Sequence, residues 1–455
     1  MLRPLTLGFA LSFLLAGCVS EPTIRFQAPE GATVLAGGSV YLGDGITLDD
    51  ALVVIDGGTI AAVAPRPSVD FTMPDSVRVV DITGRTVLPG LIDLHTHLSS
   101  DGCFTGKMSE PRLRRQLRAN LFSGVTTVLD LGSTPWLRAE RAKSISEGWD
   151  SPEILLAGPM ITAPGGHPVA AEGRFAGMVK RVSGPEAARL AVAELAGNGI
   201  DVVKAVLEGG GFGGMRTAPT LGEAELRAIA EEAHARGLKL FVHVSTPREA
   251  RIALDAGADV LAHVPISEPL PPELVRRLAT EGKAAITTLT AYEGFFRLID
   301  DPGYVDTPEV ADHVDPEVIE ACRGADVVSF ADSNPFTVYA RNQIDVARDN
   351  VSALRAAGAP IVLGTDAGNL YVFHGPAVHR ELALLVESGL SPSEAIDAAT
   401  VKAADALGRH DIGSVRPGRR ADLLIVAGNP AQRIADLADI EIVVRAGRFY
   451  DRSAL

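Results

Sequence analysis

The sequence predicts an α/β protein in which a TIM-like (β/α)8 barrel carries a small β-sandwich built from the N- and C-terminal segments of the 455-residue chain. Apolar, strand-like runs alternate with helical patterns through the middle of the chain, which is typical of parallel strands joined by helices. Short alternating runs separated by turn residues occupy the two ends. Histidine or aspartate closes several of the middle runs, which indicates a site at one end of the barrel.

Residues 1–18 are predicted to be a lipoprotein signal peptide. A single arginine precedes an apolar run from Leu5 to Leu15, which is well short of the roughly 20 residues of a membrane-spanning helix. Leu15-Ala16-Gly17-Cys18 resembles a bacterial lipobox, whose cysteine becomes an acylated N-terminus, although an ordinary signal peptide with an incidental cysteine is the alternative. We expect an exported, membrane-anchored lipoprotein on the periplasmic side, attached only by lipid at Cys18. Because no aspartate follows that cysteine, we expect the outer membrane.

The composition is that of a globular chain with an aliphatic core, since 46% of the residues are hydrophobic and 5% are aromatic. The formal net charge of −15 argues against nucleic-acid binding and against a basic membrane-binding patch. Apart from Cys18, the cysteines are Cys103 and Cys322, which are too few for a disulfide framework. The sequence leaves open whether these two pair.

Residues 31–88 and 409–455 are predicted to form the two parts of the β-sandwich. Both contain short β-like runs broken by glycine and proline, and Asp56-Gly57-Gly58 between two of the runs is a hairpin signal. The runs are Thr33–Ala36, Ala51–Ile55, Thr59–Val63 and Val77–Val80 in the first part, and Asp422–Val426, Ile440–Val444 and Arg448–Tyr450 in the second.

Residues 89–408 are predicted to form the barrel. Helical patterns such as Glu223 to Gly237 end in glycine, as helices prefer. The runs between the helices are nearly all apolar, as strands buried on both faces must be. The eight runs are Val87–His97, Thr126–Asp130, Ile154–Ala157, Asp201–Val206, Leu240–His243, Val260–His263, Ala285–Leu289 and Ile361–Asp366.

Side chains of the metal-ligand type stand where these strands end. His95 and His97 are two residues apart, so on an extended strand they project from one face. A satisfied core histidine is the alternative for any one such residue, but five of them at matching strand ends predict a metal site. The five are His95 and His97 on the first strand, His243 on the fifth, His263 on the sixth and Asp366 on the eighth.

Lys204 lies inside the apolar run of the fourth strand, where a lysine is almost never buried without a partner. Two interpretations are open. The ammonium pairs with a carboxylate of the site, or carbon dioxide carboxylates the amine, which then bridges two metal ions as an anion. Burial lowers the pKa of a lysine and favours the second interpretation.

The order His-x-His, Lys, His, His and Asp on strands one, four, five, six and eight resembles the binuclear branch of the amidohydrolase superfamily, near its imidazolonepropionase-like and Xaa-Pro dipeptidase members. Val87–His95 resembles the approach to the barrel in that family, and Gly364–Gly368 (GTDAG) resembles its eighth strand. Ala398–Thr400 with Gly413–Leu424 is similar to its return to the sandwich. The likeness extends over the chain that follows the signal segment.

The resemblance implies a metal-dependent hydrolase acting on carbon–nitrogen bonds with two divalent ions, and zinc is the expected metal. A hydroxide bridging the metals would attack the substrate carbonyl, and Asp366 would pass its proton to the leaving amine. The implied ligands are His95, His97 and Asp366 for the buried ion, His243 and His263 for the exposed one, and Lys204, as its carbon dioxide adduct, for both.

Two loops are candidates for substrate binding. Pro164–Pro168 (PGGHP) resembles a Gly-Gly-His loop of the same superfamily, in which His167 either donates a hydrogen bond to the developing oxyanion or packs on its neighbours. Glu208–Gly214 is glycine-rich but lacks the Gly-Lys-Ser/Thr of a phosphate-binding loop, so we interpret it as a flexible substrate loop.

Four further side chains are candidates for substrate contact: Tyr292, His374, Arg216 and Arg341. Either arginine would pair with a substrate carboxylate or lie on a solvated face. The connection from Tyr292 to Ala356 is longer than a barrel needs and predicts a partial lid. Its helices are also candidates for a homo-oligomer contact.

The leading hypothesis is an exported, metal-dependent amidohydrolase whose small-molecule substrates are dipeptides or N-acyl amino acids. Alternatives with a related site are a cyclic-amide hydrolase similar to imidazolonepropionase, a lactone hydrolase and a phosphotriester hydrolase. The alternative from another class is a non-catalytic surface-binding lipoprotein. Loss of ligands would favour that class, whereas all six positions are filled.

Overall fold

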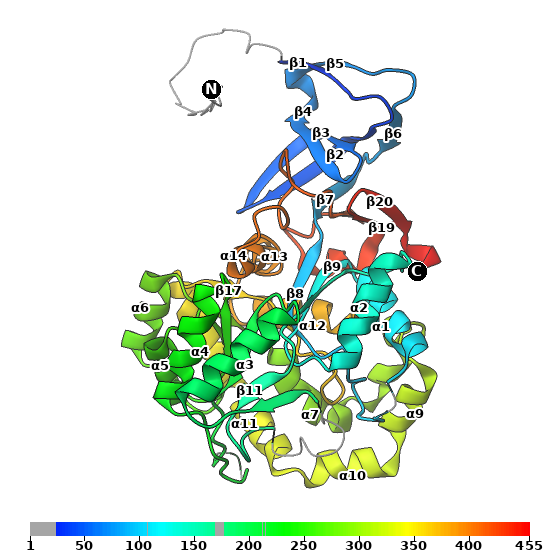
Figure 1. Ribbon diagram of the computed structural model, residues 1–455. Coiled ribbons are helices and arrows are strands. Elements are labelled where there is room, and N and C mark those ends of the chain that lie inside the picture. Colours follow the sequence, from blue (N-terminus) through cyan, green and yellow to red (C-terminus); the bar gives the residue numbers. More distant parts are fainter. Residues whose placement is uncertain (1–23, 107, 169–176, 212, 214) are drawn as a thin grey trace, which may run out of the picture.

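The computed structural model describes residues 24–106, 108–168, 177–211, 213 and 215–455. The predicted signal peptide and Cys18 lie outside these residues. Among the helices that the structure describes, none is long and apolar enough to cross a membrane. The chain forms a larger α/β unit and a smaller β unit, which lies above it in Figure 1.

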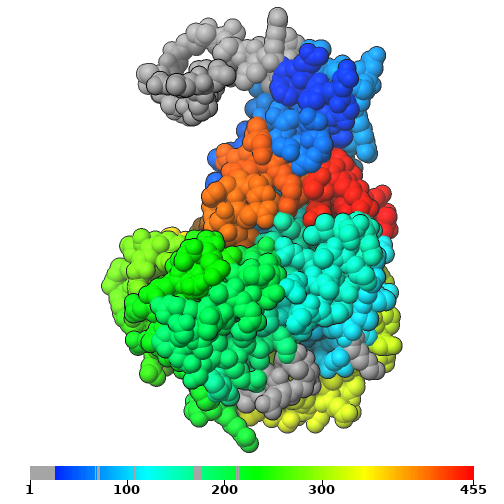
Figure 2. Space-filling model, viewed as in Figure 1, coloured from blue at the N-terminus to red at the C-terminus, as the bar shows by residue number. Residues whose placement is uncertain are grey.

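Both ends of the chain contribute strands to one eight-stranded sheet of the smaller unit. Its order is β20-β19-β18-β7-β2-β3-β4, and β6 pairs with β2. Figure 2 shows the N-terminal strands (blue) projecting from the larger unit, with C-terminal segments (orange and red) packed between. The strands are β2 (Thr33–Gly43), β3 (Ile46–Asp56), β4 (Thr59–Pro65), β6 (Arg78–Asp81), β7 (Arg85–Pro89), β18 (Leu423–Ala427), β19 (Ile440–Arg445) and β20 (Arg448–Asp451), with β1 (Ile24–Gln27) and β5 (Val69–Thr72) as a separate pair.

The larger unit contains a strand at each of the eight predicted positions. Their side chains are almost all buried, because helices cover them on the outside and the strands enclose an apolar interior. The strands are β8 (Leu91–Thr96), β9 (Val125–Asp130), β10 (Glu153–Leu156), β13 (Val203–Val206), β14 (Leu240–His243), β15 (Val260–Ala262), β16 (Ala284–Ile286) and β17 (Ile361–Val362).

These strands are parallel but form two sheets, β10-β9-β8 and β12-β11-β13-β14-β15-β16-β17. The short β11 (Met160–Thr162) pairs with β13 at Ile161, in the place that a closed ring would give to β10, and β12 (Val179–Arg181) extends that edge. At the other junction the N–H of Leu94 donates to the carbonyl of Leu363 (3.1 Å). The parallel α/β architecture is therefore established, and closure into one eight-stranded ring stays a prediction.

Helices follow the strands and cover the outside of the sheets (Figure 1). Most begin with proline in the first turn, where its missing N–H costs no hydrogen bond. They are α1 (Glu110–Phe122), α2 (Pro135–Ser146), α3 (Pro185–Gly197), α4 (Glu223–Ala235), α5 (Pro247–Ala256), α6 (Pro272–Glu281), α7 (Leu289–Asp300), α11 (Pro335–Ala356), α12 (Pro376–Glu387), α13 (Pro392–Ala398) and α14 (Val401–Leu407).

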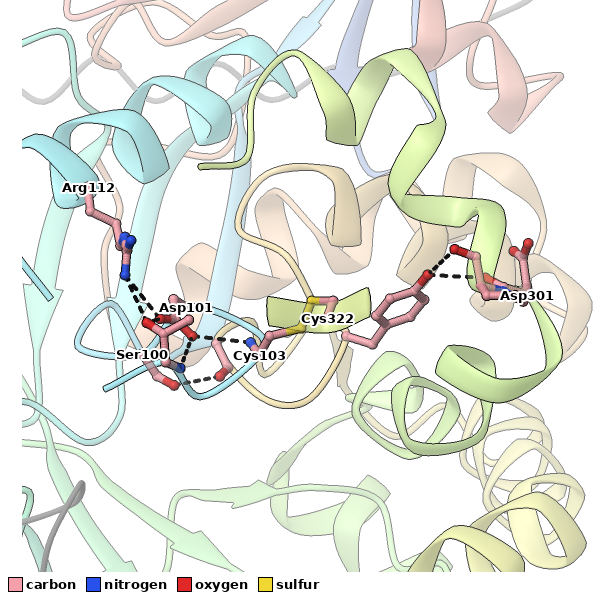
Figure 3. The surroundings of a disulfide bond; sticks show 10 residues. Ser100, Asp101, Cys103, Arg112, Asp301 and Cys322 are labelled. Atoms are coloured by element: carbon pink, nitrogen blue, oxygen red, sulfur yellow. Dashed lines mark hydrogen bonds and ion pairs between the residues drawn. A yellow bond between two sulfur atoms is a disulfide. The ribbon is translucent and has the colours of Figure 1, made fainter. Parts of the chain in front are cut away.

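A helical insertion, residues 301–334, lies between α7 and α11 where the sequence predicts a lid. It consists of the 3-10 helix η2 (Pro302–Asp306) and the helices α8 (Pro308–Ala311), α9 (Pro316–Arg323) and α10 (Ala325–Ser333). Cys103, in the loop after β8, forms a disulfide with Cys322 of α9, with a Cα–Cα distance of 5.4 Å (Figure 3). The buried Arg112 of α1 ties the same two segments together, since it donates to Thr105 (2.8 Å) and Asp315 (3.2 Å).

Candidate metal centre

The first cluster of ligand-type side chains joins β8 to the segment after β17. The Nε2 atoms of His95 and His97 lie 3.4 and 3.0 Å from Oδ1 of Asp366. The N–H of Asp366 donates to the carbonyl of His95 (2.7 Å), and Thr365 Oγ1 donates to Asp93 (2.6 Å). Backbone and side-chain hydrogen bonds thus fix the two segments against each other and hold the three groups together.

Backbone strain is concentrated at the site. Asp366 has φ of 59° and His263 has φ of 98°, both in the left-handed region that non-glycine residues rarely adopt. Thr288, beside His263, has φ of 48°. Such conformations cost about 1–3 kcal/mol each and persist where surrounding contacts over-determine them, which is common where side chains must be aimed for function.

The second cluster contains two imidazoles whose tautomers can be worked out. The hydroxyl of Thr288 donates to the carbonyl of Thr287, so it accepts from Nδ1–H of His263 at 2.7 Å, and Nε2 of His263 carries a lone pair. The carboxylate of Glu208 can only accept, so Nε2–H of His243 donates to it at 2.8 Å, and Nδ1 of His243 carries a lone pair. These two lone-pair nitrogens face each other at 2.9 Å.

Burial lowers the pKa of both imidazoles, which keeps them neutral. Two facing lone pairs at 2.9 Å repel each other unless a cation lies between them. Neutral imidazoles with their second nitrogen hydrogen-bonded are the form in which histidine binds metal ions, and the second partner fixes the tautomer. The arrangement of His243 and His263 therefore fits a divalent metal ion.

Lys204 of β13 completes the set. Its side chain is 0% exposed, and Nζ has no hydrogen-bond partner among the described residues. Burial lowers its pKa to about 7. A pairing of the ammonium with a carboxylate, one of the two interpretations of the sequence, is absent from the hydrogen bonds and ion pairs of the described residues.

Buried polar atoms that lack a hydrogen-bond partner also support metal binding by this set of side chains. Buried polar atoms without a partner cost free energy, so native proteins seldom keep several together. Four atoms of the set lack a hydrogen-bond partner among the described residues, although the last of them lies within ion-pair distance of two Nε2 atoms: Nδ1 of His95, Nδ1 of His97, Nζ of Lys204 and Oδ1 of Asp366. Two triads have ligand atoms within 4.8 Å of one another: His95, His97 and Asp366, and His167, Glu208 and His243.

Glu208 is a functional residue that the sequence analysis placed only in a glycine-rich loop. It is buried, accepts from His243 and from Ser245 Oγ (2.8 Å), and lies 3.2 Å from Nδ1 of His167. Burial alone would raise the pKa of this carboxyl, but the two histidines lower it well below its usual range. A usable signal existed, since Glu208 lies four residues after Lys204 and therefore has the same strand parity.

The predicted Gly-Gly-His loop reaches the cavity. His167 stacks on His243 with ring centroids 5.0 Å apart. Burial opposes the charged form of His167, but Glu208 outweighs this and raises the pKa of His167 above the ordinary value. A Cβ on Gly166 would lie 2.6 Å from Oγ1 of Thr162 and 2.8 Å from the carbonyl of Pro219. Only glycine permits this approach, which brings His167 beside the second cluster.

The structure places the remaining candidates differently. Tyr292 lines the cavity, but its hydroxyl donates to the carbonyl of Val264 (2.9 Å). His374 is buried behind the site, lies 3.1 Å from the carbonyl of Ser100, and does not line the cavity. Arg216 is exposed and lies outside the lining, as does Arg341, which pairs with Asp300 (2.7 Å).

The two clusters of ligand-type side chains, Lys204, His167 and Glu208 open into one cavity of about 240 Å³. One end is lined by the two clusters, Lys204, His167 and Glu208. The other end is lined by apolar and aromatic side chains from the loop after β8, from α7 and from the start of α11: Phe104, Tyr292, Phe295 and Phe336, with Met160, Met178 and Met215. The arrangement can bind a small molecule with its polar, reacting group at the donor set.

Comparison with known proteins gives one family match. The model of the amidohydrolase family matches residues 86–449. An uncharacterized protein of Mycobacterium tuberculosis is 26% identical over 367 residues, which are 81% of this chain and 86% of that protein. The imidazolonepropionase of Geobacillus kaustophilus is 25% identical over 444 residues, which are 93% of this chain and 92% of the relative.

Solved structures resemble the whole described chain. A prolidase complexed with N-methylphosphonate-L-proline is 25% identical, has a TM-score of 0.72, and is matched over 92% of this chain and 100% of its own. The ochratoxinase of A. niger shares the fold, with 24% identity, a TM-score of 0.71, and 93% and 96% of the two chains covered.

Proposed function

Because this chain belongs to the amidohydrolase family and is a hydrolase acting on carbon–nitrogen amide bonds, we propose that it cleaves the amide of a dipeptide or an N-acyl amino acid at the metal centre. The facing lone pairs of His243 and His263, beside the unpartnered amine of Lys204, carry the proposal. The likeness to the prolidase, which is 25% identical and matched over 92% of this chain, supports this substrate class.

We infer that the donor set holds two divalent ions, with zinc as the expected metal. One ion would be held by His95, His97 and Asp366. The other ion would be held by His243 and His263, and Lys204, carboxylated by carbon dioxide, would bind both ions. When bound, such ions polarise an amide carbonyl and lower the pKa of a water toward about 7.

The chain's own groups account for proton transfer and positioning. The carboxylate of Asp366 accepts the proton of the attacking water and later donates it to the leaving amine. His167, at the cavity wall, donates a hydrogen bond to the carbonyl oxygen as negative charge develops on it. Glu208 keeps His243 in the tautomer whose lone pair faces His263, and it holds His167 beside the same point.

Metal analysis combined with a substrate screen tests the proposal. Purified protein should contain close to two divalent ions per chain, should hydrolyse members of a dipeptide and N-acyl amino acid library, and should lose activity to a chelator and regain it with zinc. Lys204→Ala should lose at least one ion. A single ion per chain that is unaffected by Lys204→Ala would refute the two-ion site, and a metal-loaded protein that is inactive on the whole library would refute the proposed substrate class.

Two further expectations are also proposals. We propose that the two parallel sheets close into one (β/α)8 barrel. The hydrogen bond between Leu94 and Leu363 supports this closure. We also propose that the protein is exported and carries a lipid anchor at Cys18. The Cys18→Ser variant should then lack the lipid. Recovery of the unaltered protein from the cytosol would contradict this.

A further inference from the structure

The apolar end of the cavity is built from aromatic side chains of three separate segments. Phe104 follows β8, Tyr292 and Phe295 lie on the first turns of α7, and Phe336 begins α11. We call these four residues the aromatic wall. It starts at the metal centre, because the ring centroids of His263 and Tyr292 are 6.5 Å apart.

Phe336 contacts two other rings of the wall in an edge-to-face manner. Phe336 lies 6.5 Å from Tyr292 at an interplanar angle of 60°, and 5.0 Å from Phe295 at 81°. The hydroxyl of Tyr292 is occupied by the carbonyl of Val264, so this residue offers the cavity its ring. Phe104, Phe295 and Phe336 are half-buried and line the cavity.

Contacts in and around the cavity fix each segment of the wall. The buried Glu381 of α12 accepts from the N–H groups of Leu289 (3.0 Å) and Thr290 (2.8 Å), and so caps the start of α7 from another helix. Asn334 caps α11 by accepting from the N–H of Phe336 (3.0 Å). The Cys103–Cys322 disulfide holds the loop that carries Phe104 against the helical insertion.

The wall provides no charge for a ligand. Among the described residues that line the cavity, the groups able to carry positive charge are Lys204 and the histidines of the metal centre. The two arginines expected to bind a substrate carboxylate, Arg216 and Arg341, lie outside the lining. A charged group at the wall would lose its hydration without a cationic partner among the described lining residues outside the candidate metal centre, whereas an apolar ring gains from burial and from aromatic contacts.

We propose that the substrate carries an aromatic group next to the scissile amide and that this group binds between Phe104, Phe295 and Phe336. This rests on the proposed amide hydrolysis and narrows its substrate class. The cavity has a volume of about 240 Å³, which is below the roughly 300–1,000 Å³ of pockets that bind drug-sized ligands. Its volume therefore suits a small aromatic amide. The side chains of the wall are already held in place, so binding of an aromatic group costs little conformational entropy.

Matched amides test the proposal. kcat/KM is measured for N-acetyl-L-alanine, N-acetyl-L-phenylalanine and N-benzoyl-L-alanine, which place an aromatic group on neither side, the amine side or the acyl side of the amide. At least one aromatic member should exceed N-acetyl-L-alanine by about 10-fold or more. Phe336→Ala should reduce that preference by about 5–10-fold through KM, with unchanged metal content. Phe330→Ala is the matched control, because Phe330 lies on the neighbouring α10, is 48% exposed and does not line the cavity.

Binding provides a readout that does not depend on turnover. Calorimetric titration should show 3-phenylpropionate binding at least 10-fold more tightly than propionate, with the difference lost in Phe336→Ala and kept in Phe330→Ala. Equal binding of the two acids, or equal effects of the two substitutions, would overturn the aromatic site while leaving amide hydrolysis intact. Selective binding of the aromatic acid without hydrolysis of any amide would instead support the site and overturn the proposed function.

Discussion

Removal of the disulfide should lower the stability of the whole chain. The double variant Cys103→Ala/Cys322→Ala keeps both positions apolar, as the surrounding cluster of Leu298, Val318 and Phe373 requires. The two cysteines are separated by 219 residues. The loss of chain entropy on closing such a loop, −2.1 − 1.5R ln n cal/mol/K, amounts to about 5 kcal/mol at 25 °C, which is the upper end of measured disulfide contributions.

Thermal and urea denaturation measure this effect. With an unfolding entropy of about 2.1 cal/mol/K per residue, a loss of about 5 kcal/mol lowers Tm by about 5 °C in a chain of 455 residues. A reductant should lower the Tm of the unaltered protein by a similar amount and should leave the double variant unchanged. That variant is the control for any effect of the reductant on other groups, including Cys18.

A stability that responds to neither reduction nor the double substitution, within about 1 kcal/mol, would refute the reasoning. The cross-link would then either be absent in solution or join segments already ordered in the unfolded ensemble. Quantification of free thiols in the denatured protein separates these cases, because an unformed bond leaves both Cys103 and Cys322 reactive.

Three further predictions concern single side chains. Asp366→Asn should lower kcat by about 10²–10⁴-fold with metal content only partly reduced, and a near-normal rate of the metal-reloaded variant would assign proton transfer elsewhere. Glu208→Gln should weaken metal binding by about 10–100-fold, measured by competition with a chelator, because the amide no longer enforces the tautomer of His243; unchanged affinity would contradict this role. Glu381→Ala leaves two buried N–H groups of α7 without an acceptor and should cost about 2–6 kcal/mol in urea denaturation, whereas a loss under 1 kcal/mol would mean that water replaces the carboxylate.

The strands and the candidate ligand clusters could be predicted because their signals are local. Barrel strands are buried on both faces, so each appears as an apolar run, and a ligand at the end of a run interrupts it visibly. The parity of His95 and His97 needs only the two-residue repeat of a strand. The short β11 was not predicted, because its place in the sheet depends on its pairing with β12 and β13, which lie later in the chain.

Features that depend on distant partners could not be predicted in this way. The pairing of Cys103 with Cys322 joins segments 219 residues apart, and nothing near either cysteine indicates the other. Glu381 lies on α12, yet it caps a helix that begins about ninety residues earlier, at Leu289. Arg216 and Arg341 do not line the cavity for the same reason: Arg216 lies in the exposed loop after β13, and Arg341 of α11 pairs with Asp300 of α7.

The sheet shared by the two ends of the chain has a consequence for biosynthesis. β7 leads directly into β8 and its candidate metal ligands, and one of its edges is hydrogen-bonded to β18 from Leu423 to Ala427. This edge has no partner on a growing chain until β18 has been made. The segment bearing His95 and His97 can therefore reach its final position only after β18 has joined the sheet, so a chain that ends before β18 lacks a finished candidate site.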